Sequence, residues 1–98
     1  MTERGATVDV TNSHWSDINV YAIRGGMSVR LGTVTSMTSR TFRLPRSVIA
    51  GLADLRLHAD PIGSRHGYTS PRIIVGSGRR VIWRVENNLS LSSYAVRD

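Results

Sequence analysis

The chain has 98 residues, which suits one domain over positions 1–98, and 40% of them are hydrophobic, as in an ordinary globular protein. It contains no cysteine, which excludes disulfide bonds and thiolate metal sites. All 13 basic residues are arginine and only 7 residues are acidic, so the net charge is +6. This charge fits an acidic partner. The arginine-favouring codons of a GC-rich genome are the simpler explanation.

No apolar run approaches the roughly 18–20 residues that a membrane-spanning helix needs. The first residues, Met1 to Gly5, contain no apolar h-region, so we expect no signal peptide. The location therefore stays open between a soluble protein and one bound peripherally to a membrane.

The first predicted strand, in chain order, runs from Thr7 to Thr11, with Val8 and Val10 turned inward. The polar segment from Asn12 to Asp17 is typical of a turn. Trp15 is the one large aromatic residue of this turn, and we predict that it caps one end of the core.

Two strand-like runs, residues 18–24 and 27–34, flank Gly25-Gly26, which predicts a hairpin. A type I′ turn needs positive φ at both central residues, and glycine reaches it without a steric clash. A two-residue loop makes Arg24 face Met27, Ala22 face Val29, Val20 face Leu31, and Ile18 face Thr33. The inward residues are then Ile18, Val20, Ala22, Val29 and Leu31. The outward residues are Asn19, Tyr21, Ile23, Ser28 and Arg30.

The next segments alternate between turns and strands. A tight turn is predicted near Ser36-Met37, followed by a strand from Arg40 to Leu44 that Pro45 ends. Residues 46–53 favour a short helical turn. Further strands are predicted at 54–60, 79–86 and 89–96, and an edge or late-starting strand is predicted at 68–75, which contains Pro71. A long loop at 61–67, a second hairpin turn at Gly76-Ser77-Gly78 and a turn at Asn87-Asn88 connect them.

Seven or eight short strands, separated by turns at regular intervals, favour an all-β sandwich or barrel. Alternating apolar and polar residues favour antiparallel sheets that each expose one face to water. We therefore predict an antiparallel immunoglobulin-like or fibronectin-III-like β-sandwich with one short helical turn. A small barrel is the alternative.

Few residues suggest catalysis or metal binding. His58 and Asp60 share a strand face, and with His66 they contain the donor types of a metal site. Ser64, His66 and Asp60 contain the residue types of a nucleophilic triad. A solvated strand followed by a polar turn explains the same residues more simply. We expect no enzymatic activity, no catalytic residue, no metal and no cofactor.

Outward apolar residues near arginines are typical of protein interfaces, where tyrosine and arginine are enriched. The predicted partner-binding residues are Tyr21, Ile23, Arg24, Arg30, Arg43 and Arg84. The alternative is a nucleic-acid-binding β module, because single strands bind where basic residues alternate with aromatic ones on a sheet face. No small-molecule substrate is evident.

Several segments carry a family resemblance: Trp15, Asn19 to Tyr21, Arg24 to Gly26, Arg30 to Val34, Leu55 to Leu57, and Ala59 to Ser64. With these segments the chain resembles a small uncharacterised bacterial β-sandwich domain that is often found in envelope lipoproteins. This chain departs from that pattern because it has no lipobox cysteine. The resemblance implies an accessory or stabilising subunit of a larger bacterial membrane complex, for example a photosynthetic reaction centre.

Overall fold

The computed structural model describes residues 6–45, 53–63, 67–75, 78–86 and 92–97. Within these ranges the chain forms nine strands and no helix. The strands are β1 (Thr7–Asn12), β2 (Ile18–Arg24), β3 (Met27–Val34), β4 (Ser39–Arg43), β5 (Ala53–Pro61), β6 (Tyr68–Thr69), β7 (Ile73–Val75), β8 (Arg80–Val85) and β9 (Ser93–Arg97).

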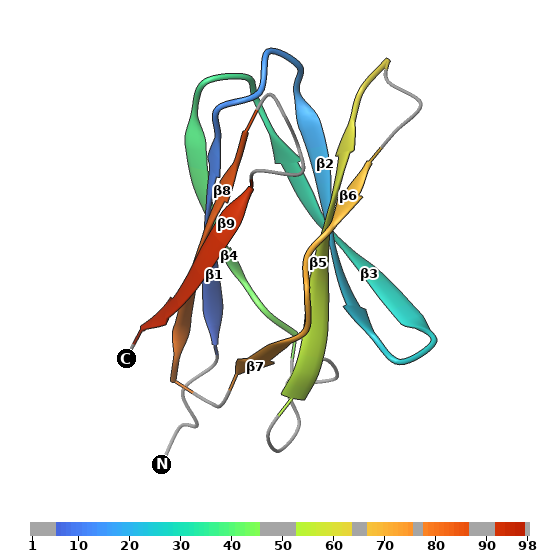
Figure 1. The fold of residues 1–98 in the computed structure, drawn as a ribbon, viewed down its shortest axis with the longest axis vertical. Coiled ribbons are helices and arrows are strands. Elements are labelled where there is room, and N and C mark those ends of the chain that lie inside the picture. Colours follow the sequence, from blue (N-terminus) through green and yellow to red (C-terminus); the bar gives the residue numbers. More distant parts are fainter. Residues whose placement is uncertain (1–5, 46–52, 64–66, 76–77, 87–91, 98) are drawn as a thin grey trace.

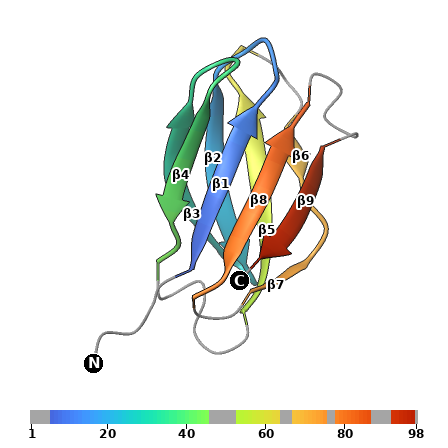
Figure 2. The same ribbon diagram turned by 90° about the vertical axis from the view of Figure 1, so that its left-hand side faces the viewer.

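The strands form two sheets that pack face to face (Figure 1). Sheet 1 has the order β4-β1-β8-β9, and Figure 2 shows it nearest the viewer. Sheet 2 has the order β3-β2-β5-β6, and β7 also pairs with β5. The predicted β-sandwich is thereby confirmed as an all-β, two-sheet architecture.

Among the described strands, all pairings are antiparallel except that of β1 with β8, which is parallel. The prediction of purely antiparallel sheets is therefore wrong for this pair. Its strands lie far apart in the sequence, so no tight turn dictates their relative direction. The immunoglobulin-like topology is not confirmed. In the constant-type order the first strand neighbours the second, whereas here β1 lies between β4 and β8.

The core lies between the sheets and follows the period-two pattern of the strands. Sheet 1 contributes the buried residues Val8, Val10, Phe42, Val81, Trp83 and Val85. Sheet 2 contributes Ile18, Val20, Ala22, Val34, Leu55, Leu57, Ala59 and Ile73. Each large apolar side chain buried in this way contributes roughly 1.5–3 kcal/mol to the free energy of unfolding.

The predicted hairpin is confirmed, with Gly25-Gly26 as its turn and with the predicted pairs of Arg24 with Met27 and of Ala22 with Val29. Gly25 has a φ of 58°, whereas the φ of Gly26 is not positive. Positive φ at the first central residue alone is the pattern of a type II′ turn. The prediction of a type I′ turn is therefore wrong.

The hairpin register changes beyond Tyr21. Tyr21 pairs with Arg30, but Val20 pairs with Gly32, so Leu31 is the extra residue of a β-bulge. The predicted pairing of Val20 with Leu31 is therefore wrong, because a simple alternation pattern does not reveal an inserted residue.

The bulge has two consequences. Ile18 now faces Val34, and Thr33 faces Asn19, so the predicted pair of Ile18 and Thr33 is also wrong. Gly32 is brought against the neighbouring sheet. A Cβ atom built there would lie 2.7 Å from the Phe42 ring, closer than real side chains approach.

The predicted edge or late-starting strand at 68–75 is interrupted around Pro71, because proline cannot donate a ladder hydrogen bond, and it forms two short strands, β6 and β7. Both pair with β5, and β6 lies at the edge of sheet 2. The prediction of a second hairpin is wrong, because β7 pairs with β5 while β8 pairs with β1 and β9. The predicted helical turn at 46–52 and the turn at 87–88 lie outside the described residues, and Ala53 begins β5.

Candidate functional site

The outer face of sheet 2 is built by two neighbouring strands, β2 and β5. The alternation that buries Val20 and Ala22 turns Tyr21 and Ile23 outward on β2. On β5 the same alternation turns Arg56 and His58 outward. Because β2 and β5 are paired, Ile23 lies opposite Arg56 and Tyr21 opposite His58.

Short contacts link the side chains at the centre of this face. The rings of Tyr21 and His58 lie 6.1 Å apart between centroids. A hydrogen bond of 2.7 Å joins His58 Nδ1 to the hydroxyl of Thr69 on β6. The ladder and these side-chain contacts together hold the Tyr21 ring at a defined place on the surface.

A second polar group lies on β2 and β3. Arg30 Nη2 donates to Asn19 Oδ1 at 3.1 Å and to Thr33 Oγ1 at 2.8 Å. The Thr33 hydroxyl donates to Asn19 Oδ1 at 2.7 Å. The bulge brings Thr33 beside Asn19, so the register shift builds this group. Neither hydrogen bond of Arg30 neutralises its charge, because both partners are uncharged.

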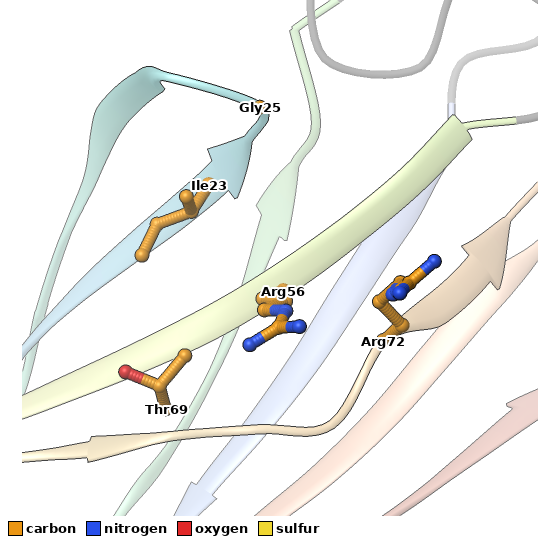
Figure 3. A pocket seen from close by; sticks show the side chains of 5 residues that line it. All are labelled: Ile23, Gly25, Arg56, Thr69 and Arg72. Carbon is orange, nitrogen blue, oxygen red and sulfur yellow. The ribbon is translucent and has the colours of Figure 1, made fainter.

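The same face contains an open hollow of about 440 Å³, lined by Ile23, Gly25, Arg56, Thr69 and Arg72. In Figure 3, Arg56 stands between Ile23 and Arg72. Within the described part of the chain, Arg56 makes no ion pair. Guanidinium groups bind carboxylates through two parallel hydrogen bonds. Two arginines beside an apolar side chain therefore suit an acidic group carried on an apolar or peptide framework.

The structure brings three of the predicted partner-binding residues together. Tyr21, Ile23 and Arg30 lie on the outer face of sheet 2, with Tyr21 directly opposite Arg30. Arg24 ends β2, is partly buried, and by alternation belongs to the side of the strand that faces the core.

Arg43 and Arg84 lie elsewhere, on the outer face of sheet 1. Both are exposed, and Arg84 Nε lies 3.9 Å from a carboxylate oxygen of Glu86. Because the two sheets pack through their inner faces, the two outer faces point in opposite directions. The six predicted residues therefore do not form one surface.

Carboxylates accompany the arginines of sheet 1. Arg80 Nε lies 3.4 Å from Asp9 Oδ2 on the neighbouring strand. The Thr41 hydroxyl donates to Asp9 Oδ1 at 2.7 Å. These carboxylates therefore partly compensate the positive charge on the outer face of sheet 1.

The predicted metal and triad residues are described only in part. His58 and Asp60 share the outer side of β5, as their spacing predicts. Among the described residues, no three His, Cys, Asp or Glu side chains gather as potential metal ligands. Ser64 and His66 lie outside the described residues.

Sequence reasoning missed several residues. Arg56 and Arg72 join Ile23 only because β5 pairs with β2, and no sequence signal identifies that pairing. The prediction that Trp15 caps the core is wrong, since its side chain is 75% exposed. The turn chemistry around Trp15 already favoured a surface position, because loops run over the surface.

Comparisons with protein-family models, with curated proteins and with solved structures find no match to this chain. No helix long and apolar enough to cross a bilayer occurs among the described residues.

Proposed function

We propose that this chain is a non-enzymatic protein-interaction module that binds an acidic segment of its partner on the outer face of sheet 2. One observation carries the proposal: Arg56 and Arg72 line the same hollow as the apolar Ile23. Protein interfaces are enriched in arginine and tyrosine, and their central contacts are apolar. Tyr21 and Arg30 lie on the same face and extend the contact surface.

We further propose that the module is an accessory subunit of a larger bacterial assembly. An immunoglobulin-like sandwich in the broad sense, two packed sheets with solvent-facing outer sides, would supply a rigid support for such a contact. The two-sheet architecture supports this, while the order of strands within the sheets differs from the constant-type order.

The alternative is binding of single-stranded nucleic acid, and a specific observation favours it as the second candidate. Tyr21 lies against His58, Arg30 lies opposite Tyr21 in the ladder, and Arg56 lies two residues before His58 on the same outer face of β5. A base could stack on such an aromatic side chain while the arginines contact phosphates.

Titration with two labelled probes separates the candidates. One probe is a peptide of alternating glutamate and leucine, and the other is a short oligothymidine. We expect the peptide to bind more tightly, and its affinity to fall in Arg56→Glu and Arg72→Glu but not in Arg80→Glu. If the oligothymidine binds more tightly, and its affinity falls linearly with the logarithm of salt concentration, the nucleic-acid function replaces the proposed one.

A further inference from the structure

At one end of the sandwich, which we call the loop end, three described loop segments lie together: residues 13–17 between β1 and β2, residues 35–38 between β3 and β4, and residues 62–63 after β5 (Figure 1). Each holds one large apolar side chain in water. Trp15 is 75% exposed, Met37 73% and Ile62 55%. Single exposed apolar residues are ordinary on protein surfaces, but three on adjacent loops form a concentrated apolar tip.

Hydrogen bonds join the three loops into one unit. The Asp17 carboxylate accepts the Ser36 N–H at 2.8 Å, and the Asp17 carbonyl accepts the Ile62 N–H at 2.9 Å. The Ser36 hydroxyl donates to the His14 carbonyl at 2.7 Å. These bonds link the β1–β2 loop to both of its neighbours, so the apolar side chains project from a shared framework.

Buried Asn12 completes this framework. Its side-chain amide donates to the carbonyls of Ser16 at 2.9 Å and Val34 at 3.0 Å, and its Oδ1 accepts the His14 N–H at 2.9 Å. The Ser16 N–H donates to His14 Nδ1 at 3.0 Å. Loop polar groups that are paired internally lose little when water is removed, so this end tolerates contact with an apolar medium.

Met37 points to a contact role. Its φ is 61°, and among described residues other than glycine it alone has a positive φ. Asparagine or glycine fits such a position with less strain. A polar residue would also suit a side chain that is 73% exposed. A methionine at this position strains the backbone and lowers solubility. A contact of its side chain with another molecule would explain why it is there.

Positive charge lies close to this end. On sheet 1, Arg40 pairs with Val10 and Arg84 with Thr11, both in the half of β1 that leads into the β1–β2 loop. Both arginines are exposed, but Arg84 lies near Glu86, and Arg40 donates to the Thr33 carbonyl at 3.0 Å. The attraction to an anionic surface therefore comes from the net charge of the whole chain, which is +6. The nearby Asp17 carboxylate accepts a backbone hydrogen bond within the framework.

We propose that the loop end is a membrane-interface anchor, which inserts Trp15, Met37 and Ile62 into the headgroup region of an anionic bilayer. Three apolar side chains that project separately suit a fluid medium, which can close around each of them. Tryptophan prefers the membrane–water interface, because its ring is apolar and its N–H is polar. The net positive charge of the chain favours anionic lipids. The surface is distinct from the hollow on sheet 2, so either proposal can fail alone.

Tryptophan fluorescence with vesicles tests the anchor directly. Trp83 is completely buried, so a change of emission wavelength on adding vesicles reports on Trp15. We expect a blue shift with vesicles of phosphatidylcholine and phosphatidylserine, and a smaller one with phosphatidylcholine alone. If neither kind of vesicle gives a shift or co-sediments with the protein, the proposal is overturned. This holds even if a soluble protein is found to bind through the same side chains.

Matched methionine variants make the test specific. Met37→Asn is expected to reduce vesicle partitioning about tenfold, from the apolar transfer that is lost, while raising the melting temperature because asparagine fits the positive φ. Met27→Asn is the control, since Met27 is 39% exposed and adjoins the Gly25-Gly26 turn. Trp15→Ser should likewise weaken partitioning. An equal loss in Met27→Asn, or no loss in Met37→Asn and Trp15→Ser, contradicts the anchor.

Discussion

The two outer faces of the sandwich carry similar arginines in different surroundings. On sheet 1, Arg80 lies beside Asp9, and Arg84 lies near Glu86. On sheet 2, Arg30 is held by an amide and a hydroxyl, and Arg56 lines an open hollow. Within the described part of the chain, the ion pairs of these arginines therefore lie on sheet 1, whereas on sheet 2 the hydrogen-bond partners of Arg30 are uncharged and Arg56 makes no ion pair.

This difference teaches that net charge alone does not identify a binding surface. What matters is the neighbour that the sheet provides for each side chain. An arginine paired to a carboxylate must give up that partner before it binds another acid. An arginine beside neutral groups binds without this loss.

The largest expected effect comes from Gly32, which follows the bulge residue Leu31. This bulge places Thr33 beside Asn19, and both contact Arg30 on sheet 2. Gly32→Ala forces a Cβ against Phe42. We expect the free energy of unfolding to fall by about 2 kcal/mol, typical of overpacking, as measured by urea denaturation. Gly26→Ala is the control, because a Cβ at Gly26 meets nothing within 4 Å. Equal losses in both variants would mean that the close approach at Gly32 has no special cost.

A smaller effect is expected from reversing one charge on each face. Arg56→Glu should weaken binding of the glutamate–leucine peptide about tenfold, or about 1.4 kcal/mol, because it places a carboxylate in the hollow. Arg84→Glu on sheet 1 should change the affinity by less than half as much. Fluorescence anisotropy of the labelled peptide measures both. If Arg84→Glu has the greater effect, the binding face is sheet 1.

The smallest expected effect comes from Asp9→Asn, which makes sheet 1 resemble sheet 2. Arg80 loses its carboxylate, and an exposed ion pair contributes only about 0.2–1 kcal/mol to stability. We expect a loss within that range that becomes smaller at high salt, measured by thermal denaturation. The variant should also bind a second glutamate–leucine peptide weakly. If the variant still binds only one peptide per chain, the carboxylates beside the arginines of sheet 1 are not what distinguishes the two faces.

Much of the fold could be predicted from the sequence, since it depends on local patterns. Alternation identified the buried sides of β1, β2, β5 and β8, and the paired glycines identified the hairpin. The bulge at Leu31 could not be predicted, because an alternation pattern does not reveal an inserted residue. The parallel pairing of β1 with β8 could not be predicted, because it depends on contacts between distant segments.

The candidate site divides in the same way. Tyr21, Ile23 and Arg30 belong to one hairpin, so its register alone brings them together. Arg56 and Arg72 join them through the pairing of β5 and the course of the chain before β7, which sequence patterns do not specify. Arg43 and Arg84 were grouped with them by residue type alone.

The parallel pairing of β1 with β8 also bears on how the chain acquires its structure. Residues 7–12 cannot take their central place in sheet 1 until residues 80–85 have been synthesised, whereas β2, β3 and β5 can pair much earlier. Contacts between such distant segments slow folding, because a long loop must close before they form. Until β8 pairs with it, one edge of β1 has backbone groups without a strand partner. Aggregation through this exposed edge is therefore most favoured at this stage of folding.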